Sequence, residues 1–584
     1  MKRIALARLL GLGFSLSLLG STAGVSPAGA TSAEPAKPAT STSPTSPTSS
    51  TSPSSPSSPS SQANLGRIDF PVTSSSAVAR EHFVRGVLAL HSFFYDEALD
   101  EFRAATQAEP SFAMGYWGEA MALNETIWEW QDLEGGRRAL ARIAGVERLP
   151  PKEQGLIAAI KLLYGEGTRP ARSLAYSREL ERLHMRFGED DELAAFYALS
   201  LLGTMVPGEN SVPTRMRAGS IALEVLAKNP LHPGAAHYVI HSFDDPTHAI
   251  LALPAARRYA RIAPEAFHAR HMPSHIFVQL GMWDEAVASC ESAWAASRAW
   301  IARRKHPLAK ADFHSLNWLV SLYLQQGRRG KAEAVLQTFR DAIALENATL
   351  MRRGYAEAVL SFLQETGAWE RTETYLAPLG KPATLSPAER AVACHPTAGN
   401  APAGVMEQLT LLTIRGLAAA ARGDDRRLAE MKSQADQLRS RLSATALGKL
   451  ASEQRRMQEA ASSAYLALAR HRPQDSAREF LKAAAIDDEL GGNDFADPGT
   501  IPWEEEAGYS WLLAGQAKEA TKAFAASLAK RPGRTRSLLG AARAAELQGD
   551  AAAVASYYGR AAANLKSAEP GAPGLTEARA RMSR

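Results

Sequence analysis

The sequence predicts an all-α fold in which antiparallel helix pairs stack into a solenoid, and three observations predict it. From about residue 79 onwards the chain is rich in Ala, Leu, Glu and Arg, a composition that favours helices. Small, aromatic and proline residues recur in the same order at several places along the chain. Finally, a chain of 584 residues with 45% hydrophobic content is too long for one ordinary core, whereas an array of small repeats accounts for its length.

Residues 1–30 have the pattern of a secretory signal peptide. The basic start Met1-Lys2-Arg3 is followed by the apolar run Leu9–Phe14, and the small residues Ala28-Gly29-Ala30 form a cleavage site. An uncleaved membrane anchor is the alternative, but glycine and serine interrupt the apolar stretch, which is short for a span. We therefore expect export to the periplasm or the cell exterior, with no transmembrane segment after cleavage.

Residues 31–62 form a Ser/Thr/Pro-rich linker that includes Thr45-Ser46-Pro47. Such a segment cannot bury apolar surface, so we expect a disordered, extended spacer. The net charge of the whole chain is +5, and the expected leader contains Lys2, Arg3 and Arg8. The remaining chain is close to neutral, which gives no reason to expect a nucleic-acid partner.

Repeated residues begin with Gly86, Ala98 and Phe102, and Pro110 follows them. The same order recurs near residues 277–286, and a third time at Gly515, Ala520, Phe524 and Pro532. Small residues allow two helices to approach closely, aromatic residues fill the space between neighbouring pairs, and proline ends the second helix. Over most of residues 79–566 this pattern resembles the tetratricopeptide repeat (TPR), which implies a TPR-type α-solenoid.

The expected organisation divides this solenoid into two parts. An N-terminal TPR array covers residues 63–380 and contains a histidine-rich region, and a shorter helical array covers residues 403–584. Between them, residues 381–402 contain several prolines and read as a loop.

Histidines concentrate in one stretch, because nine of the fourteen lie between residues 232 and 314. Two H-x3-H pairs occur there, His237 with His241 and His271 with His275. Residues four apart share one helix face, so each pair can present two imidazoles to one object. The second pair follows the first by 34 residues, which is the repeat period, so both pairs should occupy equivalent faces of successive helices.

The TPR resemblance implies that these histidines line a concave groove, which His91 and Trp117 also reach from the N-terminal repeats. The strings His232–His241 and His271–Phe277 look like those of a group of often exported bacterial TPR proteins without an assigned activity. In that group we would expect a glutamate-containing stretch where this chain has Asp244-Asp245. The expected ligand-binding residues are His91, Trp117, Asp244, His268 and His314, and the expected metal ligands are His237, His241, Asp245, His271 and His275.

Two interpretations of the histidines compete. Neutral imidazoles near a carboxylate suit a divalent metal such as zinc, and Asp244 or Asp245 would then be a ligand or would orient one. An open coordination position on that metal would allow hydrolysis by an activated water. In the alternative interpretation, the histidines cap helices, pair with the aspartates or contact a peptide.

Prolines affect the geometry of both pairs. Pro273 lies between His271 and His275, and a helix that begins there would leave His271 outside it. Pro233 is expected to open a helix, which makes His232 a candidate cap.

Two functions follow from this reading. The first is a binding scaffold whose concave groove holds a protein, a peptide or a small ligand. The second is a metal-dependent binding protein or hydrolase that uses the histidines of residues 237–275. No catalytic residue is assigned, since the sequence contains no G-x-S-x-G elbow, phosphate-binding glycine loop or HExxH motif. We expect Cys290 to be a small buried residue, and a bridge to Cys394 is the alternative.

Overall fold

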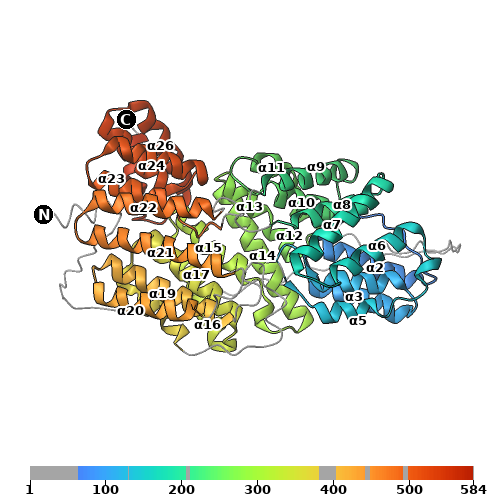
Figure 1. Cartoon of the computed structure of the whole chain (residues 1–584). Helices are drawn as coiled ribbons and strands as arrows, with labels where there is room; N and C mark the ends of the chain where they lie inside the picture. Colours follow the sequence, from blue (N-terminus) through green and yellow to red (C-terminus); the bar gives the residue numbers. More distant parts are fainter. Residues whose placement is uncertain are drawn as a thin grey trace, which may run out of the picture.

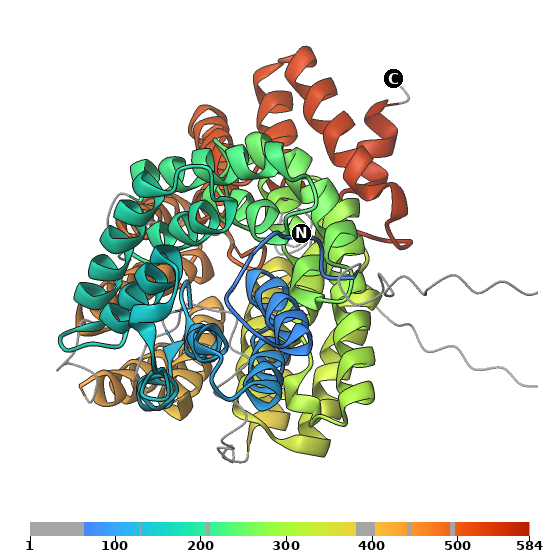
Figure 2. The same ribbon diagram turned by 90° about the vertical axis from the view of Figure 1, so that its right-hand side faces the viewer.

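The computed structural model describes residues 64–582, apart from residue 129 and residues 206–210, 381–402, 441–446 and 491–496. The expected signal peptide, the linker, the loop at 381–402 and Cys394 lie outside these described residues. Helices dominate the described chain, which confirms the all-α prediction. They follow a curved path, with α13 and α14 between the earlier helices and the later ones (Figures 1 and 2).

The first half of the chain is built from consecutive antiparallel helices that pack against their neighbours in sequence. Their bounds are α2 (Ala77–His91), α3 (Tyr95–Ala108), α4 (Ala113–Ala122), α5 (Leu133–Leu140), α6 (Pro151–Leu163), α7 (Arg169–Arg186), α8 (Asp191–Leu202), α9 (Val212–Lys228), α10 (Pro233–Ser242), α11 (Ala249–Ile262), α12 (Phe267–His271), α13 (Pro273–Gln279) and α14 (Trp283–Arg304). A short antiparallel hairpin of β1 (Asn124–Glu125) and β2 (Trp130–Gln131) interrupts them after α4.

The second half continues in the same manner. Its helices are α15 (Phe313–Gln325), α16 (Arg329–Glu346), α17 (Thr349–Thr366), α18 (Thr372–Leu376), α19 (Ala403–Ala421), α20 (Asp425–Arg439), α21 (Leu447–Ala469), α22 (Pro473–Glu489), α23 (Trp503–Leu513), α24 (Ala517–Lys530), α25 (Thr535–Gln548), α26 (Ala551–Asn564) and α27 (Leu575–Met582). None of the helices that the structure describes is long and apolar enough to cross a bilayer.

Phe102 shows why the repeat pattern has its spacing. Its ring packs between Gly86 of α2 and Gly118 of α4, and a Cβ at Gly118 would lie only 2.2 Å from the ring. The glycines therefore let three successive helices close around one aromatic side chain. Phe524 has the same relationship to Gly508 and Gly540 near the C-terminus, so the TPR-like packing predicted from these positions is confirmed at both ends of the array.

The later helices also contact the middle of the chain directly. The indole Nε1–H of Trp283 donates a hydrogen bond of 2.9 Å to the carbonyl of Gly533. The backbone N–H of Thr535 donates to the side-chain oxygen of Gln325 at 2.9 Å. One continuous hydrophobic cluster contains residues from Leu65 to Ala523, so the two expected arrays share a core.

Candidate functional site

Six of the predicted histidines come together in the interior of the solenoid. The helix α10 carries His237 and His241, α12 carries His268 and His271, α13 carries His275, and α15 carries His314. Their ligand atoms form two groups of three, and within each group these atoms lie within 4.8 Å of one another. We call the groups the first triad (His237, His241 and His268) and the second triad (His271, His275 and His314).

Pro273 does not separate His271 from His275. Met272 connects α12 to α13 and has helical dihedral angles, with φ −53° and ψ −35°. The backbone therefore continues on a helical course, and the proline occupies the first position of α13, where a missing N–H costs nothing. As a result, the Nε2 atoms of the two histidines lie 3.1 Å apart.

In the second triad, hydrogen bonds fix the orientation of two rings. The Nδ1–H of His275 donates to the carboxylate of Asp244 at 2.7 Å. The hydroxyl of Ser315 donates to Asp312, so it can only accept from Nδ1–H of His271, at 2.9 Å. When both rings are neutral, each Nε2 then carries a lone pair, and these two lone pairs face each other.

The first triad has a similar arrangement. The Nδ1–H of His237 donates to the backbone carbonyl of His91 at 2.8 Å, which leaves its Nε2 as an acceptor. That Nε2 lies 3.2 Å from Nε2 of His268. The ring of His241 packs beside His237, with centroids 4.7 Å apart.

Burial keeps the first triad neutral. It lowers the pKa of His237 to about 3, and it lowers the pKa values of His241 and His268 well below their ordinary range. Neutral imidazoles are the form that binds metals. The sequence led us to expect these rings on a concave groove, whereas in the structure all three are buried.

Aromatic side chains cover the histidines. Phe93, which follows α2, packs on all three rings of the first triad, and its centroid lies 4.3 Å from that of His237. Trp128, from the turn of the β1–β2 hairpin, meets His268 edge-on at 5.4 Å. Trp318 of α15 contacts all three rings of the second triad, at 4.5 to 5.3 Å between centroids.

Phe93 has an unusual backbone conformation for its residue type. Its φ is +50°, in the left-handed region that normally favours glycine. The N–H groups of Phe93 and Phe94 donate to the carbonyls of Leu90 and Ala89, which is the Schellman arrangement at the end of a helix. A phenylalanine replaces the usual glycine there, and its ring lies over the first triad.

The two aspartates have different roles. Asp244 contacts His275 and also accepts a hydrogen bond of 3.0 Å from the side chain of Gln279, so it orients a ring of the second triad. Asp245, one of the expected metal ligands, lies in an ion pair with Arg215. Its carboxylate accepts from Arg215 at 2.8 Å and from His248 at 2.9 Å, and it belongs to neither triad.

His91, one of the expected ligand-binding residues, belongs to a separate buried network with Glu192 and His232, whose ligand atoms also lie within 4.8 Å of one another. Its Nε2–H donates to Glu192 at 2.9 Å, and its Nδ1 lies 2.8 Å from the hydroxyl of Tyr238, which donates to it. His232 contacts the other oxygen of Glu192 at 3.1 Å. Its Nδ1 accepts from the N–H of Ala235, which confirms His232 as a cap of α10.

Trp117 also has a structural role. Its side chain is fully buried, and its ring packs in an aromatic cluster with Phe70, Phe83 and Phe196. The structure thus places Trp117, one of the expected ligand-binding residues, within the hydrophobic core. The TPR position that suggested it instead faces the core of the N-terminal helices.

Sequence reasoning missed the aromatic cover and the polar residues behind the second triad. Trp318 lies four residues after His314, so helical spacing could have placed both on one face of α15. Phe93 and Trp128 give no such signal, because tertiary packing alone brings them to the histidines. Cys290 is buried as predicted, and its sulfur lies 3.8 Å from Nδ1 of His271.

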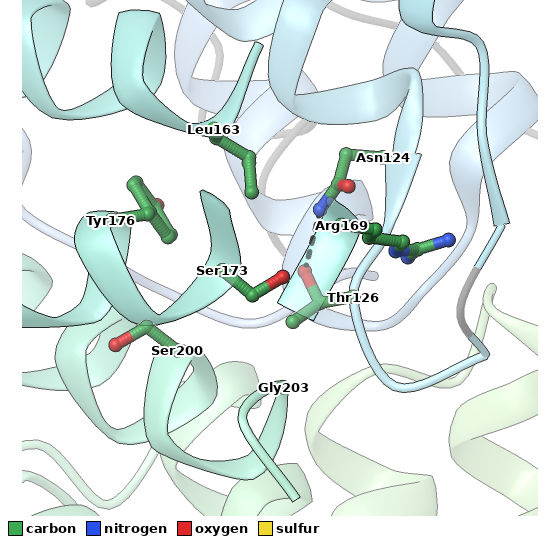
Figure 3. Close-up of a pocket in the computed structure, with 8 residues that line it drawn as sticks. All are labelled: Asn124, Thr126, Leu163, Arg169, Ser173, Tyr176, Ser200 and Gly203. Carbon is green, nitrogen blue, oxygen red and sulfur yellow. Dashed lines mark hydrogen bonds between the residues drawn. The ribbon is translucent and has the colours of Figure 1, made fainter. Parts of the chain in front are cut away.

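A small polar pocket lies beside the β1–β2 hairpin and contains none of the predicted residues (Figure 3). Its residues are Asn124, Thr126, Leu163, Arg169, Ser173, Tyr176, Ser200 and Gly203. The amide of Asn124 donates to the hydroxyl of Thr126 at 3.0 Å, as the dashed line in Figure 3 marks. Arg169 donates to the backbone carbonyls of Glu125 and Trp130, so it holds the hairpin whose turn carries Trp128.

No family model matches this chain, and no curated protein matches it. Among solved structures, the human IFIT1 dimer with m7Gppp-AAAA is 12% identical, covers 84% of this chain and 91% of its own, and has a TM-score of 0.32. Yeast Tom70 is 11% identical, with 86% and 96% of the two chains covered and a TM-score of 0.28. The APC/C hetero-tetramer Cut9-Hcn1 is 10% identical, with 86% and 76% covered and a TM-score of 0.32. The TPR-like fold itself is evident in the packing of Phe102 and Phe524.

Proposed function

We propose that this protein binds a transition-metal ion through the imidazoles of its two triads. The observation that carries the proposal is the 3.1 Å separation between Nε2 of His271 and Nε2 of His275, with both Nδ1 atoms held by oxygen partners. Two facing lone pairs repel unless a proton or a metal ion lies between them. Two nitrogens bound at about 2.05 Å to one tetrahedral zinc ion lie about 3.3 Å apart, close to the separation found here.

The side chains around the triads favour the binding of a metal ion over the hydrolysis of large substrates. Zinc bound by three imidazoles would keep one open position, which supplies a water of lowered pKa. The rings of Phe93, Trp128 and Trp318 pack directly against the imidazoles on several sides. The proposed function is therefore metal binding, and hydrolysis is not part of the proposal.

Metal analysis of the purified full chain tests this function. We expect bound metal in the wild-type protein, less in a His237→Ala/His241→Ala variant, and an unchanged amount in His248→Ala. The last histidine comes from the same stretch of sequence but pairs with Asp245 outside the triads. Adding zinc at 100 times its dissociation constant should stabilise the metal-free protein by about 2.7 kcal/mol. Absence of metal together with an unchanged melting temperature on adding zinc would rule the function out.

A binding scaffold is the second candidate, and the stacked helix pairs favour it. Solenoids of this kind present extended concave surfaces, which bind proteins and peptides. A peptide or protein that binds the His237→Ala/His241→Ala variant as tightly as the wild type would support this function without any metal. We propose no nucleic-acid partner, given the near-neutral chain that follows the expected leader.

The proposed location is outside the cytoplasm, in the periplasm or beyond the cell. The support is the basic and apolar start of the sequence with its small-residue cleavage pattern at Ala28-Gly29-Ala30. Sequencing the N-terminus of the protein recovered from cell fractions tests this proposal. A mature chain that begins after Ala30 is expected, and an intact Met1 in a cytoplasmic fraction would contradict it.

A further inference from the structure

The two triads are neighbours and not separate sites. His268 of the first triad and His271 of the second lie three residues apart on α12, one helical turn from each other. Their ring centroids are 6.1 Å apart, and those of His241 and His275 are 6.4 Å apart. These distances between triads are no longer than the 6.5 Å between His241 and His268 within the first triad. The six imidazoles therefore form one continuous cluster.

All six side chains of the two triads are imidazoles. Among the described residues, no carboxylate belongs to either triad. Asp244 acts through His275, and Asp312 acts through Ser315 on His271. Both carboxylates thus lie behind rings of the second triad.

The nearby charges disfavour two divalent ions. The charge of Asp244 is partly offset by the buried guanidinium of Arg531, which interacts with it electrostatically. Two divalent ions in this interior would bring four positive charges with little compensation, which is costly in a low-dielectric environment. Two monovalent ions halve that charge. Copper is the metal that combines a stable monovalent state with the highest divalent affinity for nitrogen ligands in its series.

We propose that the two triads form one binuclear copper centre, with one ion held by each triad. This inference rests on the proposed metal-binding function and adds the number of ions, their proximity and the identity of the element. The ions share the turn of α12, and aromatic rings cover both. Phe93 and Trp128 lie on the first triad, and Trp318 lies on the second.

Copper titration of the metal-free full chain, followed by electron paramagnetic resonance, tests the inference. We expect two copper ions per chain. The protein loaded with Cu(I) should give no signal. After oxidation by added ferricyanide, the doubly loaded protein should give a Cu(II) signal altered by coupling between the two ions, with a lower intensity per copper or a half-field transition. A wild-type sample loaded with less than one copper ion per chain should show more of the signal of isolated Cu(II) than the fully loaded sample. Both samples in this comparison are wild type.

Variants then assign the ions to their triads. His268→Ala should bind one copper ion, which should give an uncoupled signal. His268→Gln is the folding control for this position, and its circular dichroism spectrum should match that of the wild type. His248→Ala is the matched control and should retain two coupled ions. In competition, copper should displace zinc from both triads.

The outcomes separate this inference from the function on which it rests. Two uncoupled copper ions, or a single ion per chain, would overturn the binuclear centre and leave metal binding in place. Zinc retained in the presence of equimolar copper would overturn the choice of element. A wild-type chain that binds no metal would overturn both proposals.

Discussion

The Nε2 atoms of His271 and His275 face each other at 3.1 Å across the junction of two short helices. Their other ring nitrogens are held by Ser315 and Asp244, so the hydrogen-bond network determines which ring nitrogens face each other. This relationship makes the second triad the better-defined half of the cluster. Its supporting residues are therefore the most informative positions for mutation.

Replacing Asp244 by asparagine should weaken metal binding at the second triad by about 10- to 100-fold, because the neutral amide no longer raises the basicity of His275. Chelator competition measures this affinity. Asp245→Asn is the matched control, since Asp245 pairs with the buried Arg215 instead. That control should lose about 3 kcal/mol of folding stability while its metal affinity stays unchanged. Equal losses of affinity in both variants would contradict the distinct roles of the two aspartates.

Alanine variants are usually more stable than glycine variants, and the left-handed conformation of Phe93 predicts the opposite order at this position. At φ +50°, Phe93→Gly should be more stable than Phe93→Ala by about 1 kcal/mol, since only alanine has a Cβ in conflict with the backbone. Phe83 lies inside α2, where the glycine variant should be the less stable one by about 1 kcal/mol. Urea unfolding of the four variants gives these free energies. The same order at both positions would refute the backbone argument.

The packing of Phe102 predicts the effect of small changes at glycine. Gly118→Ala should destabilise the protein by about 1–3 kcal/mol, because the new methyl group would overlap the buried ring. Gly559 of α26 has open space around its Cβ position, so Gly559→Ala should stabilise its helix by roughly 0.5–1 kcal/mol. Thermal unfolding compares the two variants. A neutral Gly118→Ala would show that the three helices are not closely packed.

The network of His91, His232 and Glu192 predicts acid sensitivity. Burial raises the pKa of Glu192, but its interactions with His232 and His91 outweigh burial and lower the pKa from 4.5 to about 2. The stability contributed by this carboxylate is therefore present above about pH 4.5 and is lost as the pH falls through about 2.

The measurement is the free energy of unfolding as a function of pH. Glu192→Gln should lose about 1–3 kcal/mol at neutral pH, because the amide cannot accept both N–H groups, and its profile between pH 4.5 and 2 should be flatter. Glu189→Gln is the control, since the Glu189 side chain is almost fully exposed. Parallel profiles for Glu192→Gln and the wild type would exclude this origin of acid sensitivity.

Local patterns in the sequence predict the fold well because each repeat is a local unit. Gly86 and Phe102 lie within one helix pair, so their spacing alone indicates that two helices meet closely. The same logic places His237 and His241 on one face of α10. The 34-residue interval between the two H-x3-H pairs likewise predicts that successive helices bring them together, and in the structure they form adjacent triads.

Long-range packing explains what the sequence could not predict. The TPR positions of His91 and Trp117 suggested a groove, whereas neighbouring helices bury both side chains. Asp245 looked equivalent to Asp244, but Arg215, thirty residues earlier, pairs with it. Phe93 lies far in sequence from the three histidines of the first triad, so its position over their rings depends on the tertiary fold.

The five residues of α12 have a consequence for any attempt to redesign this protein. His268 and His271 occupy the same turn, yet each belongs to a different triad. A substitution that tilts this turn would displace a ligand of both triads in one movement. In the proposed metal centre, the affinities of the two sites are thus mechanically linked, and selection acting on one of them would also act on the other.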